Sequence, residues 1–232
     1  MNKIGIIGAM DEEVKELQKL MKNTKVESIA TMDFYQGTIK DKNVVVVRSG
    51  IGKVNAAICA QILIDKFNVE GIINTGIAGS LEAKIDIGDM VLSSDAIQHD
   101  VDVRAFGHEL GKIPRMENSV FVADSNMLGK AKSICKEVNS DINVYVGRVL
   151  SGDQFIQDKE KKDWLVSNFS GICVEMEGAS IAHVAVLNNT PFLIIRAISD
   201  KADGSAQMDY YQFEALAIER TVKLLIELIP SL

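Results

Sequence analysis

Four ionisable side chains follow two apolar runs in the C-terminal third of this chain. Glu175 and Glu177 directly follow a short β-rich run. Arg196 and Asp200 follow the unbroken apolar run Phe192–Ile195, which is typical of a buried parallel strand. Because ligands of open α/β sheets bind beyond the carboxyl ends of the strands, we expect these groups to meet at a site for acid–base chemistry. For any one of them, an Arg–Glu pair that closes a strand end is the simpler explanation.

A further group of acids lies near the N-terminus, at a strand-to-helix turn. Lys3–Gly8 predicts a short buried strand, and the apolar spacing after it predicts a helix that Asp11 begins. Asp11, Glu12 and Glu13 therefore occupy the first helical turn. Each could simply cap the helix or complement its dipole. Such a turn is also where a functional carboxylate would face a ligand, so both explanations stay open.

The elements that must position these acids alternate between strands and helices. Strands are expected at 3–8, 34–39, 43–47, 71–74, 88–93, 144–150, 172–174 and 192–195, and helices at 11–21, 54–67, 125–138, 159–168, 178–187 and 209–230. Glycine-rich turns are expected at 49–53 and 75–80, but neither completes a dinucleotide fingerprint or a phosphate loop. The pattern predicts an α/β fold, and we expect one domain over residues 1–232, because no repeat or linker interrupts it.

The composition excludes several classes of protein. The chain has 232 residues, 47% of them hydrophobic, and a formal net charge of −7, which argues against nucleic acid and anionic membranes as partners. No apolar run is long enough to span a membrane, and no secretion signal precedes the first strand, so we expect a cytoplasmic protein. Three cysteines and three histidines are scattered along the chain, so we expect free thiols and no metal or other cofactor.

The polar segment from His99 to His108 and the residues after it carry apolar side chains that need a cover. Val103, Phe106 and Pro114 are the residues concerned. A subunit interface or a ligand lid would supply that cover.

Seven segments together resemble the bacterial 5′-methylthioadenosine/S-adenosylhomocysteine nucleosidases of the purine nucleoside phosphorylase superfamily. They are IGIIGAMDEEV (4–14), SGIGKV (49–54), NTGIAG (74–79), HDVDVRAFG (99–107), SGDQFI (151–156), VEME (174–177) and RAISD (196–200). They occur in family order and run nearly from end to end. The resemblance implies a three-layer α/β/α sandwich around a central mixed, partly barrel-like β-sheet.

The resemblance also implies a reaction, the hydrolysis of the bond between adenine and a 5′-thio-substituted ribose or 5′-deoxyribose in methionine salvage. Adenine leaves readily only when N7 is protonated, the ribose becomes oxocarbenium-like, and a base must orient the attacking water. By position in the motifs, Asp200 would protonate N7, Glu13 would activate the water, and Glu177 would hold the ribose hydroxyls.

The other motif residues would bind or orient the substrate. Arg196 and Glu175 would orient the carboxylates, and Ser199 would position Asp200. Substrate contacts are expected from Phe155, Ile156 and Met176 around adenine and the sugar, from Met10, Ile51, Val103, Phe106, Pro114 and Tyr210 around the 5′-thio group, and from Ile77 and Gly79. In the family, the region of Val103, Phe106 and Pro114 reaches the neighbouring subunit, which implies a homodimer.

Three alternatives keep the fold and change the function. A phosphorylase would use phosphate as its nucleophile, but Glu13 and the apolar Met10 and Ile77 are poor partners for an anion. A non-catalytic nucleoside binder would lack Glu13 or Asp200, and both are present. A nucleosidase for a related nucleoside such as aminodeoxyfutalosine would differ only in its 5′ pocket.

Overall fold

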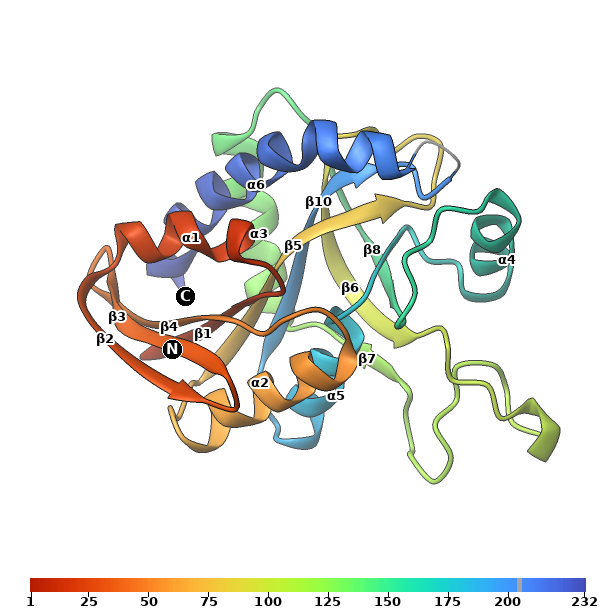
Figure 1. Ribbon diagram of the computed structural model, residues 1–232, viewed down its shortest axis with the longest axis horizontal. Helices are drawn as coiled ribbons and strands as arrows, with labels where there is room; N and C mark the ends of the chain where they lie inside the picture. The colour runs from red at the N-terminus through yellow and green to blue at the C-terminus, as the bar shows by residue number, and fades with distance from the viewer. Residues whose placement is uncertain (204–205) are drawn as a thin grey trace.

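The structure is a computed structural model that describes the backbone of residues 1–203 and 206–232 and the side chains of 1–203 and 213–232. In these residues, ten strands form one sheet with helices on both faces (Figure 1). The strands are β1 (Lys3–Gly8), β2 (Lys22–Ile29), β3 (Met32–Ile39), β4 (Lys42–Arg48), β5 (Gly71–Ser80), β6 (Met90–Gln98), β7 (Val120–Val122), β8 (Val144–Ser151), β9 (Cys173–Glu175) and β10 (Phe192–Asp200). The helices are α1 (Asp11–Leu20), α2 (Lys53–Asp65), the short 3₁₀ helix η1 (Arg104–Phe106), α3 (Ser125–Val138), α4 (Lys159–Phe169), α5 (Gly178–Leu187) and α6 (Ala206–Ser231).

One half of the sheet is an open, twisted wing. β1 lies between β4 and β5 and is parallel to both, while β3 and β2 continue the wing as antiparallel strands. The hairpin of β3 and β4 was expected from their apolar runs. β2 was not expected, because its sequence KNTKVESI is mostly polar and the strand is largely exposed.

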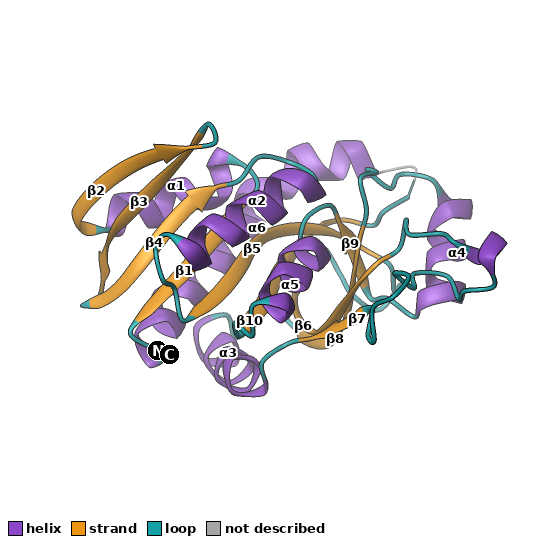
Figure 2. Ribbon diagram, turned by 90° about the horizontal axis from the view of Figure 1, so that it is seen from below, coloured by secondary structure: helices purple, strands orange, loops and turns teal. Residues whose placement is uncertain are grey.

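The other half of the sheet closes on itself. β10 is parallel to β5 and antiparallel to β6, so the last strand of the chain lies between two earlier ones. β6 continues through β8 to β9, and β9 pairs with β5 to complete a ring of five strands (Figure 2). The expected mixed, partly barrel-like sheet is therefore confirmed.

Two helical layers cover the sheet. α1, α3 and α6 lie on one face, and α2 and α5 pack together on the other (Figure 1). α2 and α5 bury small and apolar residues such as Cys59 and Ala182. All three cysteines are buried and free, as expected. Within the described residues, no helix combines the length and the apolar character needed to cross a bilayer.

Several expected boundaries were wrong, among them the end of the strand expected at 88–93, which runs to Gln98 as β6. The predicted turn at 75–80 is the second half of β5, and the predicted end of the last strand at Ile195 is the middle of β10. β10 continues through the polar Arg196 and Ser199 because they find buried partners, which an apolar run cannot reveal. β5 continues through its glycine-rich half because that half pairs with β10 and β9. The last helix begins at Ala206, so Asp209 lies inside it and is not its cap.

Candidate active site

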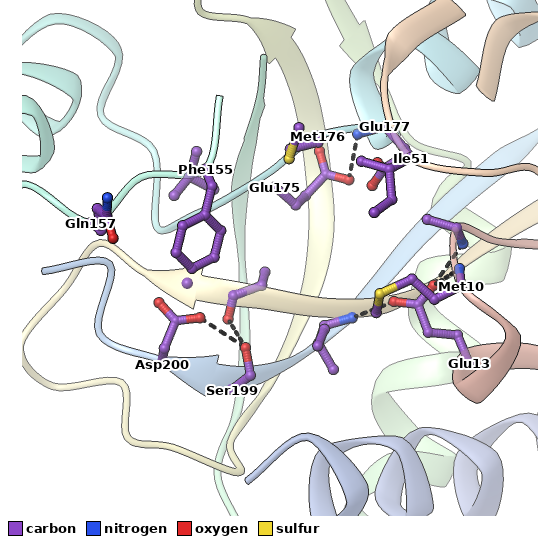
Figure 3. A pocket seen from close by; sticks show the side chains of 15 residues that line it. Met10, Glu13, Ile51, Phe155, Gln157, Glu175, Met176, Glu177, Ser199 and Asp200 are labelled. Atoms are coloured by element: carbon purple, nitrogen blue, oxygen red, sulfur yellow. Dashed lines mark hydrogen bonds between the residues drawn. The ribbon is translucent and has the colours of Figure 1, made fainter. Parts of the chain in front are cut away.

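A cavity of about 610 Å³ opens where the parallel strands β1, β5 and β10 reach their carboxyl ends (Figure 3). Its lining comes from the segments after β1, β4 and β8, from β5, from β9 and the turn after it, and from the end of β10. The lining residues are Ala9, Met10, Glu13, Ile51, Ile77, Ala78, Gly79, Phe155, Gln157, Val174, Glu175, Met176, Glu177, Ser199 and Asp200. Four of these residues are acidic and none is basic, so the wall formed by the described residues is unsuited to an anion.

Glu13 enters the cavity from the first turn of α1. Its Oε2 accepts hydrogen bonds from the backbone N–H of Ala9 (2.6 Å) and Met10 (3.1 Å), and its Oε1 accepts one from the N–H of Ile77 on β5 (3.2 Å). Met10 is the residue before the helix, so Asp11 does not cap it. Burial raises the pKa of Glu13, against the opposing effects of the Arg196 charge and the three amides.

Two glycines of β5 make room for the carboxylates. Gly76 has φ +156°, and a Cβ on it would lie 2.3 Å from Glu13 Oε1. A Cβ on Gly79 would lie 2.8 Å from Asp200 Oδ1. The glycines of the NTGIAG motif thus mark close approach of side chains to a strand, and not the turn that the sequence predicted.

Glu175 forms an ion pair with Arg196 beneath the cavity wall. Both side chains are almost completely buried. Glu175 Oε2 also accepts the backbone N–H of Glu177 (3.1 Å) and Gly178 (2.7 Å), while Oε1 accepts the Ser151 hydroxyl. Glu175 is therefore held on every side, and Arg196 lies behind it and does not line the cavity.

Glu177 lies two residues further on, at the start of α5. Its Oε1 accepts the backbone N–H of Gly52, 2.8 Å away, and this is the one bond that its side chain accepts from the described part of the chain. The pKa of Glu177 is raised, mainly by burial of the carboxyl group and to a smaller extent by the nearby Glu175 carboxylate. Its other oxygen is available to a ligand.

Asp200 ends β10 at the side of the cavity where Phe155 lies (Figure 3). Its Oδ2 accepts the Ser199 hydroxyl (2.9 Å), and its Oδ1 accepts the backbone N–H of Ala202 (2.8 Å). Asp200 is 2% exposed, so these contacts fix a carboxyl group inside the protein.

The structure brings most of the expected site residues together and leaves others apart. Ile156 lines a small hollow that adjoins the cavity. Val103, Phe106 and Pro114 do not line the cavity of their own chain. Val103 and Phe106 belong to an arm around η1 that projects from the body (Figure 1), and Phe106 on it is 84% exposed. Pro114 lies between Ile113 and Met116, which pack against the core. The side chain of Tyr210 lies outside the described residues.

Four lining residues were not expected. They are Ala9, Ala78, Gln157 and Val174. Ala9, Ala78 and Val174 lie inside the seven motif segments, and Gln157 directly follows one of them. Each is adjacent in sequence to an expected residue, and that adjacency is the signal that could have found them.

Comparisons with known proteins show to which family this chain belongs. The model of the phosphorylase superfamily matches residues 3–230. The 5′-methylthioadenosine/S-adenosylhomocysteine nucleosidase of Staphylococcus carnosus is 40% identical over 230 residues, which are 99% of this chain and all of the relative. The crystal structure of the Neisseria meningitidis nucleosidase of the same name, in complex with methylthio-immucillin-A, has a TM-score of 0.96 and 35% identity over the whole of both chains. Futalosine hydrolase of Helicobacter pylori has a TM-score of 0.94 and 34% identity, and covers all of this chain and 98% of its own.

The chain thus belongs to the phosphorylase superfamily, a class that includes enzymes acting on nucleosides, and its partly closed mixed sheet is the fold of that class. Within that class, the chain belongs to the family of 5′-methylthioadenosine/S-adenosylhomocysteine nucleosidases, which are hydrolases of N-glycosidic bonds.

Proposed function

We propose that this protein hydrolyses the N-glycosidic bond of 5′-methylthioadenosine and S-adenosylhomocysteine, and also of 5′-deoxyadenosine, to release adenine. One observation carries the proposal. Glu13, Glu177 and Asp200, which are far apart in sequence, line a single cavity. Its volume of about 610 Å³ suits a ligand of nucleoside size.

Asp200 is the proposed general acid. It lies close to Phe155, whose ring offers a stacking surface for the base (Figure 3). The Ser199 hydroxyl fixes one carboxyl oxygen of Asp200. A proton passed from Asp200 to N7 of adenine would turn the base into a good leaving group. Ile156 and Met176 would complete the adenine site.

Glu13 is the proposed general base. It lies beside Met10, at the end of the cavity away from Asp200 (Figure 3). The raised pKa of Glu13 brings it nearer to neutral pH, where a general base is most effective. The carboxylate would take a proton from water as the water attacks C1′, while Glu177 accepts hydrogen bonds from the ribose hydroxyls. The developing positive charge on the ribose is stabilised by these nearby acids.

Phosphorolysis is disfavoured by the same lining. The described residues of the cavity wall carry four carboxyl groups, and the neighbours of Glu13 on that wall are the apolar Met10 and Ile77. Phosphate binding needs converging cations or free amides, and the amides near Glu13 already bind its carboxylate.

A chromatographic assay of adenine release tests the proposed reaction. Purified protein is incubated with methylthioadenosine, S-adenosylhomocysteine and 5′-deoxyadenosine, with and without phosphate. We expect free adenine and a free 5′-substituted ribose in both conditions. A strict requirement for phosphate, with a sugar 1-phosphate as product, would show a phosphorylase instead. Tight binding of these nucleosides without adenine release would show a non-catalytic binder.

Futalosine hydrolysis is the second candidate, because the Helicobacter pylori enzyme of that name shares the fold at 34% identity. The two reactions need the same carboxylates and differ in the 5′ substituent. Adding aminodeoxyfutalosine to the assay separates them. A rate on it more than about tenfold above that on methylthioadenosine, equivalent to 1.4 kcal/mol in the barrier, would reverse our assignment.

We further propose that the protein is a cytoplasmic homodimer of one domain per chain, active in methionine salvage. The dimer is supported by an apolar surface on α2 and α5, which pack together. Val54 and Leu187 there are 70% and 64% exposed, and Ile58 and Val186 lie on the same two helices. A partner on this surface would also allow the arm with Phe106 to complete a neighbouring 5′ pocket.

Sedimentation velocity tests the dimer. We expect a mass of two chains for the parent protein and of one chain for Val54→Lys, because a charge in the interface is costly. A monomeric parent with full activity would refute the dimer and the shared pocket together.

A further inference from the structure

Lys53, at the first position of α2 and two residues after Ile51 of the cavity lining, forms an ion pair that the proposed mechanism does not use. Its Nζ donates to Gln98 Oε1 (3.1 Å) at the end of β6 and to Asp100 Oδ1 (2.6 Å), two residues further on. The side chains of Lys53 and Asp100 are 18% and 22% exposed. Burial alone would raise the pKa of Asp100, but bonds from the Lys53 ammonium and the Asp153 amide bring it below its ordinary value.

Asp153, in the segment after β8, closes this pair into a ring. The backbone N–H of Asp153 donates to Asp100 Oδ2 (3.1 Å), and Asp153 Oδ1 accepts the backbone N–H of Lys53 (2.9 Å). Three segments from different parts of the chain are therefore joined by three bonds, two of which involve backbone amides. We call Lys53, Asp100 and Asp153 the clamp.

The clamp is one residue away from the proposed ribose site. The amide before Lys53, that of Gly52, donates to Glu177 Oε1 at 2.8 Å. Ile51 and Phe155, which line the cavity on two different walls, each lie two residues from a member of the clamp. A shift of the Lys53 backbone would therefore move the donor that holds Glu177.

An isolated surface ion pair would contribute little and would orient nothing. The clamp differs from such a pair because its carboxylates bind backbone amides of the segments that carry cavity residues. Resting on the function proposed above, we infer that Lys53, Asp100 and Asp153 are positioning residues for Glu177. They fix the Gly52 amide and so set recognition of the ribose hydroxyls.

Substrates with and without the ribose hydroxyls test this inference. Asp153→Ala and Lys53→Met are assayed on methylthioadenosine and on its 2′,3′-dideoxy analogue. We expect kcat/KM on methylthioadenosine to fall about tenfold, since small displacements of a positioning contact have effects of this size or larger. On the dideoxy analogue we expect a fall of less than about twofold, because Glu177 then has no hydroxyl to hold. Lys53→Arg should restore most of the loss.

The matched control is Asp163→Asn, which removes the acid of the exposed Lys159–Asp163 pair and should leave both substrates unaffected. Equal losses on the two substrates would overturn the inference and leave the clamp a general structural feature. If Asp153→Ala does not fold, Lys53→Met takes its place, because this change removes no backbone donor or acceptor. The test is then the ratio of its kcat/KM losses on methylthioadenosine and on the dideoxy analogue.

A failure of the proposed function can be told apart from a failure of this inference, because in the first case the parent protein itself releases no adenine. In that event calorimetry replaces kinetics, with methylthio-immucillin-A and its dideoxygenated form as ligands. A clamp variant that weakens binding of the first about tenfold and of the second less than about twofold supports the inference. Equal weakening, or none, refutes it.

Discussion

Glu175 and Glu177 are two residues apart and equally buried, at 7% and 6% exposure, yet their surroundings differ. Glu175 accepts two amides, a hydroxyl and a guanidinium group. Glu177 accepts one amide from the described part of the chain. A buried carboxylate with all its partners holds the fold together, while one that lacks partners is free to bind a ligand at the expense of stability.

The same contrast separates the layer beneath the cavity from the cavity wall. Arg196 below the wall contacts Glu175 and Asn74, and Asn74 in turn donates to the backbone of β1 (3.1 Å). Glu13 on the wall is bound by three amides, yet burial still raises its pKa. Substitutions in the lower layer should therefore affect folding first, and substitutions on the wall should affect catalysis first.

The largest effect is expected from the proposed acid. Asp200→Asn should lower kcat by about 10²–10⁴-fold, because an amide has no proton of suitable acidity for N7. Thermal unfolding of the variant should stay close to that of the parent, since the amide oxygen can still accept the Ala202 N–H while the amide NH2 donates to Ser199 Oγ. Single-turnover release of adenine measures the chemical step. A loss smaller than about tenfold would remove Asp200 from the role of acid.

Arg196→Met comes next and should act on folding. The change leaves Glu175 buried without its cation, which costs about 3–5 kcal/mol of unfolding free energy. Urea titration followed by circular dichroism measures this. Lys159→Met, which breaks an exposed pair, is the control and should change the unfolding free energy by less than about 0.5 kcal/mol. Similar values for the two variants would contradict the assignment of Arg196 to the structural layer.

Glu177→Gln should separate stability from activity. In the folded protein the pKa of Glu177 is raised above its ordinary value of 4.5. Such a carboxyl group contributes its full stability below pH 4.5 and loses that contribution as the pH rises through the folded pKa. At pH 7 the neutral amide should therefore stabilise the free protein by about 1 kcal/mol, or about 2–4 °C in Tm. At pH 4 the gain should disappear, while activity is reduced at every pH. A variant destabilised at pH 7 would refute this.

The smallest effect concerns pH. Glu13 must be ionised to act as a base, and its raised pKa places the acid limb of the kcat/KM profile above pH 4.5. We expect the rate to fall as the pH is lowered from 7 towards 4.5, because Glu13 takes up a proton. In Glu13→Gln this limb should vanish together with most of the activity. A parent profile that is flat down to pH 4.5 would contradict the shift.

The sequence predicted the core strands well and the polar ones poorly. Apolar runs such as 3–8 and 192–195 identified β1 and the start of β10, because burial on both faces demands unbroken apolar residues. β2 has no such run. Arg196 was placed beyond its strand because no local pattern shows that Glu175, 21 positions away, neutralises it inside the sheet.

The candidate site was predictable in part of its membership but not in its roles. Motif positions named Glu13, Glu177 and Asp200, and the cavity brings them together. Spacing alone could not separate Glu175 from Glu177, nor Glu13 from Asp11, because the distinction depends on amides supplied by β5 and by Gly52. The roles of these residues and the extent of the domain stay predictions.

The position of β10 also has a consequence for biosynthesis. A ribosome must translate nearly the whole chain before the strand that fits between β5 and β6 is available. Until then two interior strands present unpaired backbone edges, which readily pair with other chains. Nascent or truncated polypeptides that end before residue 192 should therefore depend on chaperones and form inclusion bodies, and no partly active fragment should be recoverable.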